Sequence, residues 1–426
     1  MLRGKSMNEK HPEMVHSEPD GRAGVLLFAT LVLCAAFGEV ATGLLTPAMP
    51  TLGVLYDKAP STVQLTIVSF AITFALGQLF FGPFSDRKGR RKALLIGAAL
   101  TLAGSVSAGL ADSIWGIIVG RAIQGLGAAS GYVVSRAMVR DIYGAKGAAL
   151  AMALVFTLMA ASFLAAPLVG GLLLEFGSWR AGFMLASIAA ALWLASSIFI
   201  VPETKLAAPE TKAQAIYSVY LGLFRDRGFL SYLITHSIAY GGLYCFVAGA
   251  PYLFIKAYAF KPANYGTVAA IVMTGFLMGS FAARYASPKW GMHRAILVSL
   301  AIMCGASTIL LALDQVGQLT VAIIVTIEFA YWFGAGFLAP NTAAGVMMSH
   351  PKAIGAVAAA LGFCQMCFAG TVAFVQGLLY DGTALPMLGA QAVLSVITLV
   401  TWRYLRRRLR RRACPKTVGR ELRRSY

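Results

Sequence analysis

Long apolar runs separated by short polar segments dominate this chain from residue 23 onward. Each of twelve runs is close to the ~20 residues that an α-helix needs to cross ~30 Å of hydrocarbon. The runs are continuous, unlike the alternating segments of a membrane β-strand. Because a backbone in the bilayer core must satisfy its own hydrogen bonds, runs of this length predict helices. The expected spans are 23–46, 62–84, 93–111, 114–135, 147–173, 179–201, 229–252, 265–286, 294–313, 318–346, 353–379 and 385–404.

The expected spans divide into two sets of six around a polar segment at 202–228, the longest hydrophilic stretch inside the chain. Two six-helix halves are the layout of a transporter built from a repeat, with the substrate site at mid-membrane between the halves. We therefore expect an all-α membrane protein of twelve helices in two pseudo-symmetric halves. Its parts are an N-terminal tail at 1–22, a first half at 23–201, a linker at 202–228, a second half at 229–404 and a basic tail at 405–426.

The composition excludes a soluble globular protein of this length. Only 12% of the 426 residues are charged and 58% are hydrophobic, with a mean hydropathy of +0.72. Soluble domains carry about 25% charged residues. The first apolar run is longer than that of a signal peptide, so we expect it to be retained as a span.

The formal charge of +19 reflects a one-sided distribution of Lys and Arg. With the N-terminus inside, nearly all of these residues fall in inner segments and few in outer loops. Positive residues mark the cytoplasmic side of membrane proteins, so we expect both termini in the cytoplasm. The arginine-rich stretch at 403–412 directly follows an apolar run. We expect it to contact anionic lipid headgroups rather than nucleic acid.

Other classes of site leave little trace in the sequence. Cys364 and Cys367 have CxxC spacing but no accompanying second CxxC or pair of histidines, so we expect no metal or redox site. No HExxH and no phosphate-binding glycine-rich loop is found. We therefore expect neither an enzyme nor an ATP-driven pump, and no bound cofactor.

The segment 82–92, Gly-Pro-Phe-Ser-Asp-Arg-Lys-Gly-Arg-Arg-Lys, combines a turn glycine with an acid among basic residues. A tight turn between antiparallel spans needs the free backbone of glycine, which Gly89 supplies. The basic residues follow from the charge rule, but Asp86 needs a partner where a helix enters the membrane. The candidates are a neighbouring helix N-terminus, which carries about +0.5 charge, Arg136 and Arg140.

This segment resembles the signature loop of the major facilitator superfamily. The resemblance implies a latch that holds the two halves together on the cytoplasmic face when the protein opens outward. The matching residues are Gly82, Asp86, Arg87, Gly89, Arg90 and Arg91. A weaker copy at 287–294 repeats a Ser four residues before a Gly, followed by basic residues, but lacks the acid. The copy supports an internal repeat.

Further segments narrow the resemblance to proton-coupled exporters. Residues 121–129 resemble the fourth-helix motif of such exporters, and 166–171, with Pro167, Gly170 and Gly171, resemble the fifth-helix antiporter motif. We expect Pro167 to bend its span because it removes a helix hydrogen bond. Three more segments are similar to the drug-efflux branch known as Bcr/CflA: 77–83, 202–204 and 338–344.

One position departs from that branch. The branch usually carries an aspartate four residues before the proline that ends the first helix. Here that proline is Pro47, and position 43 is glycine. The acid is Glu39, one helical turn deeper in the span. The coupling chemistry of the branch therefore does not transfer directly to this chain.

Ionisable residues inside spans are functional candidates because they are costly to place there. Glu39 is a candidate for binding a proton or a cationic substrate, since desolvation favours the neutral form of a carboxyl group; the alternative is a structural acid paired with a neighbouring helix. Arg121 needs a carboxylate, carbonyl groups or an anionic substrate. The resemblance implies that Arg121 takes part in proton coupling. The alternative is a purely structural role. A direct pair of Glu39 with Arg121 is a further hypothesis.

Two candidates lie in the second half. Glu328 has Tyr331 and Trp332 three and four residues on, which favours a cationic or amphipathic substrate; the alternative is a hydrogen bond between helices. His236 begins a stripe with Tyr240 and titrates near neutral pH, but a histidine at the membrane surface explains it equally well.

The function that we expect is proton-coupled export of a small molecule by alternating access. The drive is the proton motive force, and the location is the inner membrane of a bacterium, as a monomer. The alternative is a proton-coupled importer of a sugar or organic acid on the same fold. The sequence does not choose among antibiotics, siderophores, amino-acid derivatives and sugars as cargo.

Overall fold

A computed structural model describes residues 21–204, 220–350 and 354–413. Twelve helices within these ranges are long and apolar enough to cross a membrane, which confirms the expected number of spans. The first half consists of α1 (Gly21–Leu45), η1 (Thr46–Ala48), α2 (Met49–Leu55), α3 (Pro60–Lys88), α4 (Arg90–Gly109), α5 (Ile114–Phe176) and α6 (Trp179–Phe199). The second half consists of α8 (Arg227–Pro251), η2 (Tyr252–Ala257), α9 (Pro262–Trp290), α10 (Met292–Gln315), α11 (Val321–Ser349), α12 (Ile354–Leu379) and α13 (Leu385–Ala413).

Several spans are longer than the sequence predicts. The first continues through η1 and α2 to Leu55, because Pro47 and Pro50 occupy first-turn positions where a missing N–H breaks no helix bond. The fourth and fifth spans are joined in α5, with a turn at Gly144 where φ is 61°. The last helix runs to Ala413 rather than ending near residue 404. The expected N-terminal tail and most of the linker lie outside the described residues.

Helix starts follow ordinary capping chemistry. The hydroxyl oxygens of Ser113, Ser178 and Thr320 accept backbone N–H groups at the first turns of α5, α6 and α11. The carboxylate of Asp226 does the same for α8. Most loops between the described spans are only a few residues long, so helices that follow one another run antiparallel.

The internal repeat is visible in the loops that follow α3 and α9. Gly89 and Gly291 have φ of 105° and 77°, in the left-handed region that glycine adopts without strain. In each loop the glycine N–H donates to the carbonyl of the serine four residues earlier, at 3.1 Å for Ser85 and 2.9 Å for Ser287. The two halves therefore share this turn in detail.

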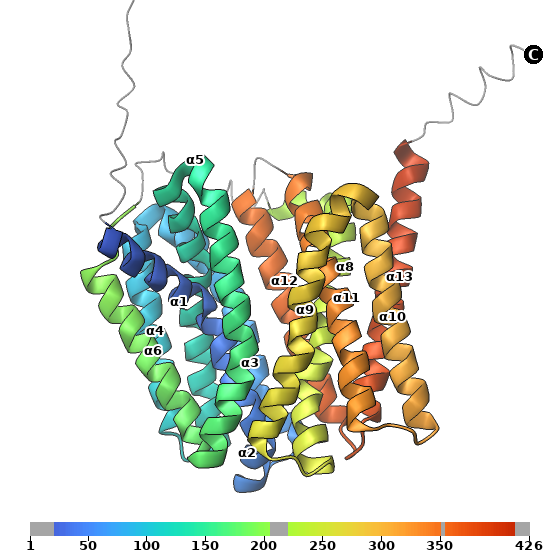
Figure 1. Cartoon of the computed structure of the whole chain (residues 1–426). Helices are drawn as coiled ribbons and strands as arrows, with labels where there is room; N and C mark the ends of the chain where they lie inside the picture. The colour runs from blue at the N-terminus through green and yellow to red at the C-terminus, as the bar shows by residue number, and fades with distance from the viewer. Residues whose placement is uncertain (1–20, 205–219, 351–353, 414–426) are drawn as a thin grey trace, which may run out of the picture.

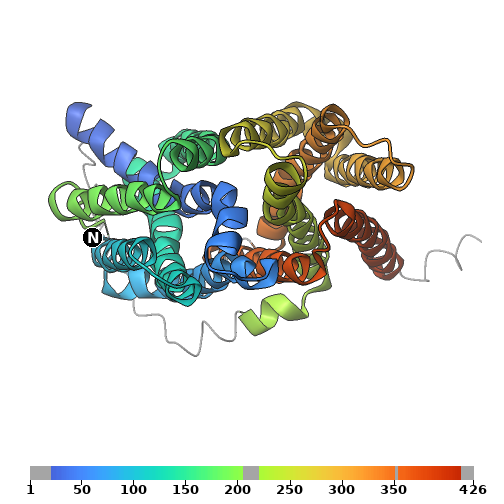
Figure 2. The same ribbon diagram turned by 90° about the horizontal axis from the view of Figure 1, so that it is seen from below.

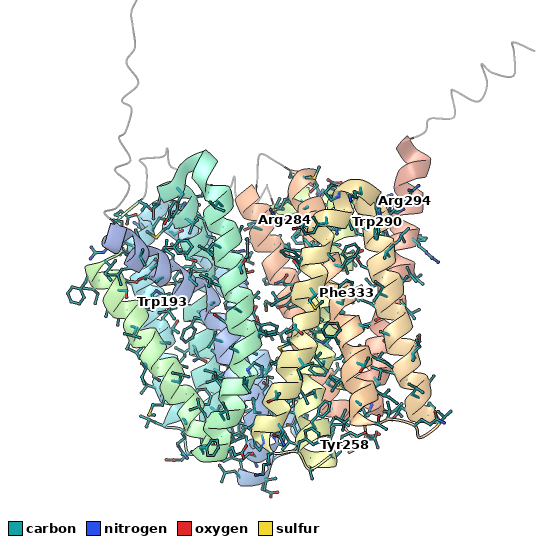
Figure 3. All side chains as sticks on the ribbon, viewed as in Figure 1. Trp193, Tyr258, Arg284, Trp290, Arg294 and Phe333 are labelled. Carbon is teal, nitrogen blue, oxygen red and sulfur yellow. The ribbon has the colours of Figure 1, made fainter. Side chains whose placement is uncertain are left out.

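Both described ends of the chain lie at the same end of the molecule (Figure 1). We call this end the inner side and the opposite end the outer side. Arg284, Trp290 and Arg294 gather at the inner side, and Tyr258 lies at the outer side (Figure 3). This arrangement agrees with the charge rule and with aromatic residues near membrane surfaces.

Figure 2 shows the helices of the first half, blue to green, on one side and those of the second half, yellow to red, on the other. Each half has a large apolar cluster, and a third cluster joins the two halves. The halves meet chiefly where α5 packs on α9 and α3 packs on α12. The ribbons of α5 and α9 converge toward the outer side (Figure 1). The interface between halves is therefore the place to look for a site.

Candidate functional site

Glu39 lies at the midpoint of the Gly24–Leu55 span and faces the second half. Its carboxyl group interacts with the hydroxyl of Tyr240, which lies on α8. Tyr240 in turn interacts with Tyr244, one turn further along α8, with ring centroids 5.5 Å apart. Glu39 remains partly exposed. This acid at mid-membrane therefore connects the two halves and remains partly accessible.

Aromatic side chains of the first half lie next to Tyr240, the partner of this acid. Tyr132 of α5 lies near Tyr240 and packs on Phe74 of α3, with ring centroids 5.4 Å apart. The guanidinium of Arg136 lies 3.7 Å over the Tyr132 ring. Sequence reasoning did not identify Tyr132, because one tyrosine in an apolar helix carries no signal of the face on which it lies. Rings of this kind suit apolar and aromatic molecules.

His236 joins three helices of the second half. Its Nδ1 lies 2.8 Å from the hydroxyl of Thr342 on α11, and its Nε2 lies 3.0 Å from the Gln365 amide oxygen on α12. The side chain is buried, with 9% of its surface exposed. The interpretation of His236 as a histidine at the membrane surface is therefore wrong. Its stacking on Tyr240 connects this network to the acid.

A small hollow adjoins Tyr240 on the side of the second half. It is formed by α8, α9 and α11, and His236, Tyr240 and Phe276 are among its lining residues. The cavity volume is about 10 Å³, which is room for about one water molecule. Pockets for drug-sized ligands are about 300–1,000 Å³. A ligand of that size therefore requires the halves to move apart beside Glu39.

Arg121 is fully buried inside the first half. Its guanidinium donates to the carbonyls of Thr66 and Ala41, both at 3.2 Å, and to the Gln124 side chain at 2.6 Å. It also lies 4.1 Å from the centre of the Phe70 ring. Carbonyl oxygens therefore accept hydrogen bonds from the guanidinium, which is one of the kinds of partner that the sequence predicts for Arg121. Arg121 fastens α1 and α3 to α5.

Glu39 and Arg121 form no direct ion pair within the described part of the chain. They approach α1 on neighbouring turns, since Arg121 bonds to the carbonyl of Ala41. Tyr244 of α8 lies near both groups. The two groups therefore lie around the same part of α8 without contacting each other.

Glu328 lies apart from these residues. It is fully buried in the second half, and its Oε2 accepts a hydrogen bond from the Gln391 amide of α13 at 3.1 Å. Its neighbour Trp332 stacks on Phe163 of the first half, with centroids 6.1 Å apart. The hydrogen bond between helices that was expected as the alternative is thus present. The structure does not bring Glu328 to Glu39.

The antiporter-like segment of α5 closes the outer side. A Cβ added at Gly171 would lie 2.3 Å from the Pro262 carbonyl oxygen of α9, and one at Gly170 would lie 2.5 Å from the Leu44 carbonyl oxygen of α1. These approaches bring backbone against backbone, which only glycine allows. The carbonyl of Pro167 takes part in the same contact, against Gly266.

The same packing explains the glycine at position 43. A Cβ there would lie 2.6 Å from the Ala166 side chain and 3.2 Å from the Pro167 ring. An aspartate has no room at this position in the outer-closed arrangement. The shift of the acid from position 43 to Glu39 therefore goes with close packing of α1 on α5 at position 43.

Polar contacts between the halves strengthen the outer closure. Lys261 at the start of α9 pairs with Glu175 at the end of α5, with Nζ 3.5 Å from Oε1. The Gln64 amide of α3 donates to the carbonyl of Ala248 on α8 at 2.8 Å. Both contacts lie in the outer part of the molecule. The conformation is closed on the outer side.

The signature loop lies on the inner side, and Asp86 pairs with Arg90 of the same loop at 2.6 Å. The expected partners Arg136 and Arg140 are therefore wrong for this conformation. Arg90 also contacts Asp141 of α5 at 3.2 Å. The Asp86 side chain remains 63% exposed. The acid is free to meet another partner when the halves move.

Glu203, just after α6, caps the first turn of α4. Its carboxylate accepts the backbone N–H groups of Arg90 and Arg91, at 2.8 and 3.2 Å. In return the Arg91 side chain donates to the carbonyls of Ser197 and Ile198 at the end of α6, at 3.1 and 2.5 Å. The anion at the start of α4 and the cation at the end of α6 each interact favourably with the dipole of that helix.

We expect Glu203→Ala to destabilise the first half by about 0.5–2 kcal/mol, as loss of a helix cap does. The measurement is the apparent melting temperature of the purified protein in detergent, which should fall. Asp112→Ala is the matched control, because the Asp112 side chain is 96% exposed and its ion pair with Arg180 lies at the surface, where such pairs contribute little to stability. Equal melting temperatures for the two variants would contradict the capping role.

Comparison with known proteins gives this arrangement a family. The sequence model of the Major Facilitator Superfamily matches residues 31–374, which is most of the chain. The chain belongs to the Major Facilitator Superfamily. The resemblance of the signature loop is thereby confirmed, and the twelve-helix membrane protein is a transporter of this fold.

Curated relatives within the superfamily carry the names of resistance proteins. The bicyclomycin resistance protein homolog of Haemophilus influenzae is 27% identical over 354 residues, covering 82% of this chain and 88% of that protein. Multidrug resistance protein D of Escherichia coli is 27% identical over 385 residues, covering 88% and 96%. These relatives confirm the similarity to the drug-efflux branch.

The superfamily fold is also seen in solved structures. The crystal structure of a D-xylose-proton symporter superposes with a TM-score of 0.72, covering 89% of this chain and 97% of that one. The identity is only 15%, so the likeness concerns the fold alone. Within this fold the site described above occupies the interface between the halves, where superfamily transporters bind their substrates.

Proposed function

We propose that this chain is a proton-coupled exporter of a small molecule, such as a drug, siderophore or metabolite, working by alternating access. The observation that carries the proposal is the Glu39 carboxyl, placed at mid-membrane and in contact with Tyr240 of the other half. A group that spans the interface responds to any movement between the halves. The drug-resistance names of the relatives support a drug as cargo.

The outer-closed conformation supplies one of the two states that the cycle needs. In it, Gly170 and Gly171 hold α5 against α1 and α9, and Asp86 on the inner side is exposed. In the opposite state the outer contacts separate and the signature loop engages the second half. Asp86, Arg87 and Arg90 are the residues that we propose for that latch.

Glu39 couples the two fluxes by holding one partner at a time. A carboxylate away from water is costly, so it takes up either a proton or a polar group of the substrate. Exchange of one for the other at each end of the cycle ties proton entry to substrate exit. A gradient of one pH unit provides about 1.4 kcal/mol per proton, which supports roughly tenfold accumulation for one-to-one exchange.

The twelve apolar spans and the one-sided distribution of basic residues support a location for this transporter. We propose a bacterial inner membrane protein that acts as a monomer with both termini in the cytoplasm, where its basic residues meet anionic lipid. Arg406 is held over Tyr232 and Trp402, at 4.2 and 4.5 Å from the ring centres. Residues 414–426 of the basic tail lie outside the described residues. No bound cofactor is proposed, since the drive is the proton motive force.

The test uses purified protein reconstituted in vesicles with an imposed pH gradient and a panel of uncharged antibiotics headed by bicyclomycin. An exporter of this kind drives at least one of them toward the acidic side, counter to the protons. Accumulation on the alkaline side would mean symport and would overturn the proposal. The absence of any pH-driven movement across the panel would also count against it.

A further inference from the structure

Glu328 and Gln391 form a buried polar pair that the site at Glu39 does not use. Both side chains are fully buried in the second half, in the packing of α8, α11 and α13. The Gln391 amide donates to Oε2 of Glu328 at 3.1 Å. The other oxygen of each group, Oε1 of Glu328 and Oε1 of Gln391, has no hydrogen-bond donor among the described residues.

Two acceptors that lack a donor, on groups already hydrogen-bonded to each other, point to a missing proton. An ionised carboxylate and an amide oxygen both accept, so neither can satisfy the other. A proton on Glu328 turns one acceptor into a donor and leaves a neutral acid beside an amide. Burying a neutral, hydrogen-bonded group is far less costly than burying an unpaired charge.

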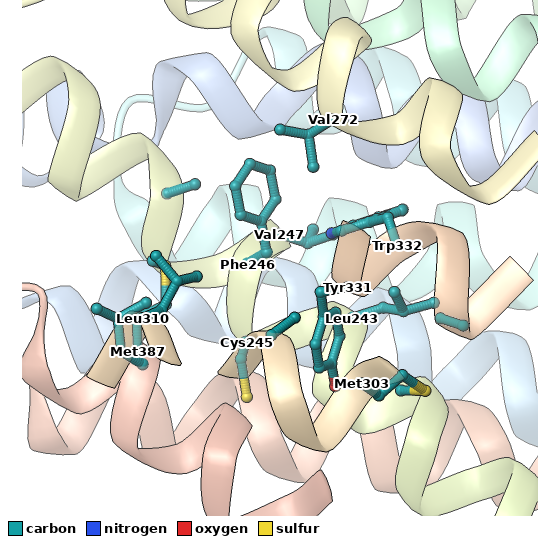
Figure 4. Packing of buried hydrophobic residues seen from close by; sticks show 14 of the residues in the cluster. Leu243, Cys245, Phe246, Val247, Val272, Met303, Leu310, Tyr331, Trp332 and Met387 are labelled. Atoms are coloured by element: carbon teal, nitrogen blue, oxygen red, sulfur yellow. The ribbon is translucent and has the colours of Figure 1, made fainter. Parts of the chain in front are cut away.

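Among the described residues, no ion pair compensates a negative charge on Glu328. Cys245 from α8 and Tyr331 from the same helix lie beside it, and Cys304 from α10 lies beyond Tyr331. Ser395 on α13 approaches the Tyr331 hydroxyl at 3.4 Å. These groups are neutral at physiological pH, and none of the ion pairs among the described residues involves Glu328. Figure 4 shows Cys245 and Tyr331 within this packed interior.

A line of polar groups leads from the pair to the outer side. Glu328 lies seven residues into α11, which is about 10 Å from its outer end. Cys245 beside it interacts with the Gln376 side chain near the outer end of α12. The Gln376 amide donates to the carbonyl of Pro386 at the outer start of α13, at 3.0 Å.

We propose that Glu328 and Gln391 form a second proton-binding site, separate from Glu39, that exchanges protons with the outer side and is protonated in the outer-closed conformation. Binding converts the Glu328 carboxylate to a carboxylic acid with a proton taken from water, and release reverses this step. The role of the site in export rests on the proposed function, but its occupancy by a proton does not.

Infrared difference spectroscopy of the purified full-length protein tests the site without any substrate. The protein is taken through pH steps, in H₂O and D₂O, and the stretch of a protonated carboxyl group is followed. We expect a carboxyl band that shifts in D₂O, weakens as the pH is raised, disappears in Glu328→Gln and persists in Glu39→Gln. The glutamine variant retains an NH₂ donor in place of the acid proton, so it should fold.

Two results would overturn the proposal. Identical spectra for wild type and Glu328→Gln would show that the acid is ionised. A band that is lost in the variant but insensitive to pH in the wild type would mark a permanent hydrogen-bond donor rather than a site of proton exchange. Should Glu328→Gln fail to fold, Gln391→Met keeps the acid and removes the amide, and its band should move toward that of a free acid. An unmoved band in Gln391→Met would overturn the pairing.

Failure of the site and failure of the export function give different results. If the wild type moves no drug, the infrared result still stands on its own. If export is intact, Glu328→Gln should shift the dependence of the transport rate on the outer pH, while the drug concentration ratio at a fixed pH gradient is still set by proton exchange at Glu39.

Discussion

Replacing Glu39 with glutamine is expected to abolish pH-driven drug accumulation while leaving the protein folded in the membrane. Glutamine has nearly the same shape and can still contact Tyr240, but it cannot release or bind a proton. The wild type should reach roughly tenfold accumulation under a gradient of one pH unit if one proton exchanges for one drug molecule. The variant should only equilibrate the drug across the vesicle membrane.

The assay includes a readout that does not need net proton movement. Exchange of labelled for unlabelled drug across vesicles without a gradient should persist in Glu39→Gln, because alternating access itself remains. Asp112→Asn is the matched control, since this acid is exposed and pairs only with Arg180 of the same half among the described residues. Full pH-driven accumulation by the glutamine variant would remove Glu39 from the coupling and return the question to Glu328.

Replacing Gly171 with valine is expected to prevent closure of the outer side and so to stop transport. The Cβ would lie 2.3 Å from the carbonyl oxygen of Pro262 and 2.8 Å from its carbonyl carbon. Both are backbone atoms, which cannot move aside as a side chain can. Overpacking of this kind costs about 1–3 kcal/mol, enough to shift the balance between two conformations about 5- to 150-fold.

The shift is measured by labelling a cysteine introduced at Ser61, where α3 begins against Gly377 of the second half. Its reaction with a membrane-impermeant maleimide from the outer side should be faster in Gly171→Val than in the parent. Gly389→Val is the control, because nothing lies within 4 Å of a Cβ at that helical glycine. Equal labelling rates for Gly171→Val and its parent would contradict the role of this segment as the outer seal.

The sequence predicts the elements of this fold better than the contacts between them. The twelve apolar runs and the positive-φ turn at Gly89 follow from composition and backbone chemistry, and the structure has both. The ends of the spans are less well predicted, because Pro47 continues a helix at a first-turn position instead of ending it. A helix that is apolar on all sides has no periodic signal for the face that meets a neighbour.

The contacts of the candidate site residues are also poorly predicted by the sequence. Glu39 and Arg121 can be found as charges inside apolar spans, but their partners lie far away in the sequence. Tyr240 belongs to the other half, and Thr66 is 55 residues from Arg121. The cap that Glu203 places on α4 bridges 113 residues. Such pairings depend on how the helices are rotated and packed, which a single sequence does not encode in any local pattern.

The glycines of the outer seal are a further example. The resemblance of residues 166–171 to an antiporter motif predicts that they matter, and small residues predict close packing in general. Only the structure shows that Gly171 meets α9 while Gly170 meets α1. It also gives a reason for the glycine at position 43, which appears in the sequence only as a departure from the family pattern.

Protons and substrate should move in opposite directions through this transporter, and reversing the pH gradient across reconstituted vesicles tests this most directly. Bicyclomycin is the first probe, because the distribution of an uncharged molecule responds to neither pH nor voltage on its own. With an acidic lumen, protons leave and we expect drug to accumulate inside the vesicles. With an acidic exterior we expect depletion of preloaded drug. The opposite pair of results, accumulation with an acidic exterior and depletion with an acidic lumen, would identify an importer and rule out proton-coupled export.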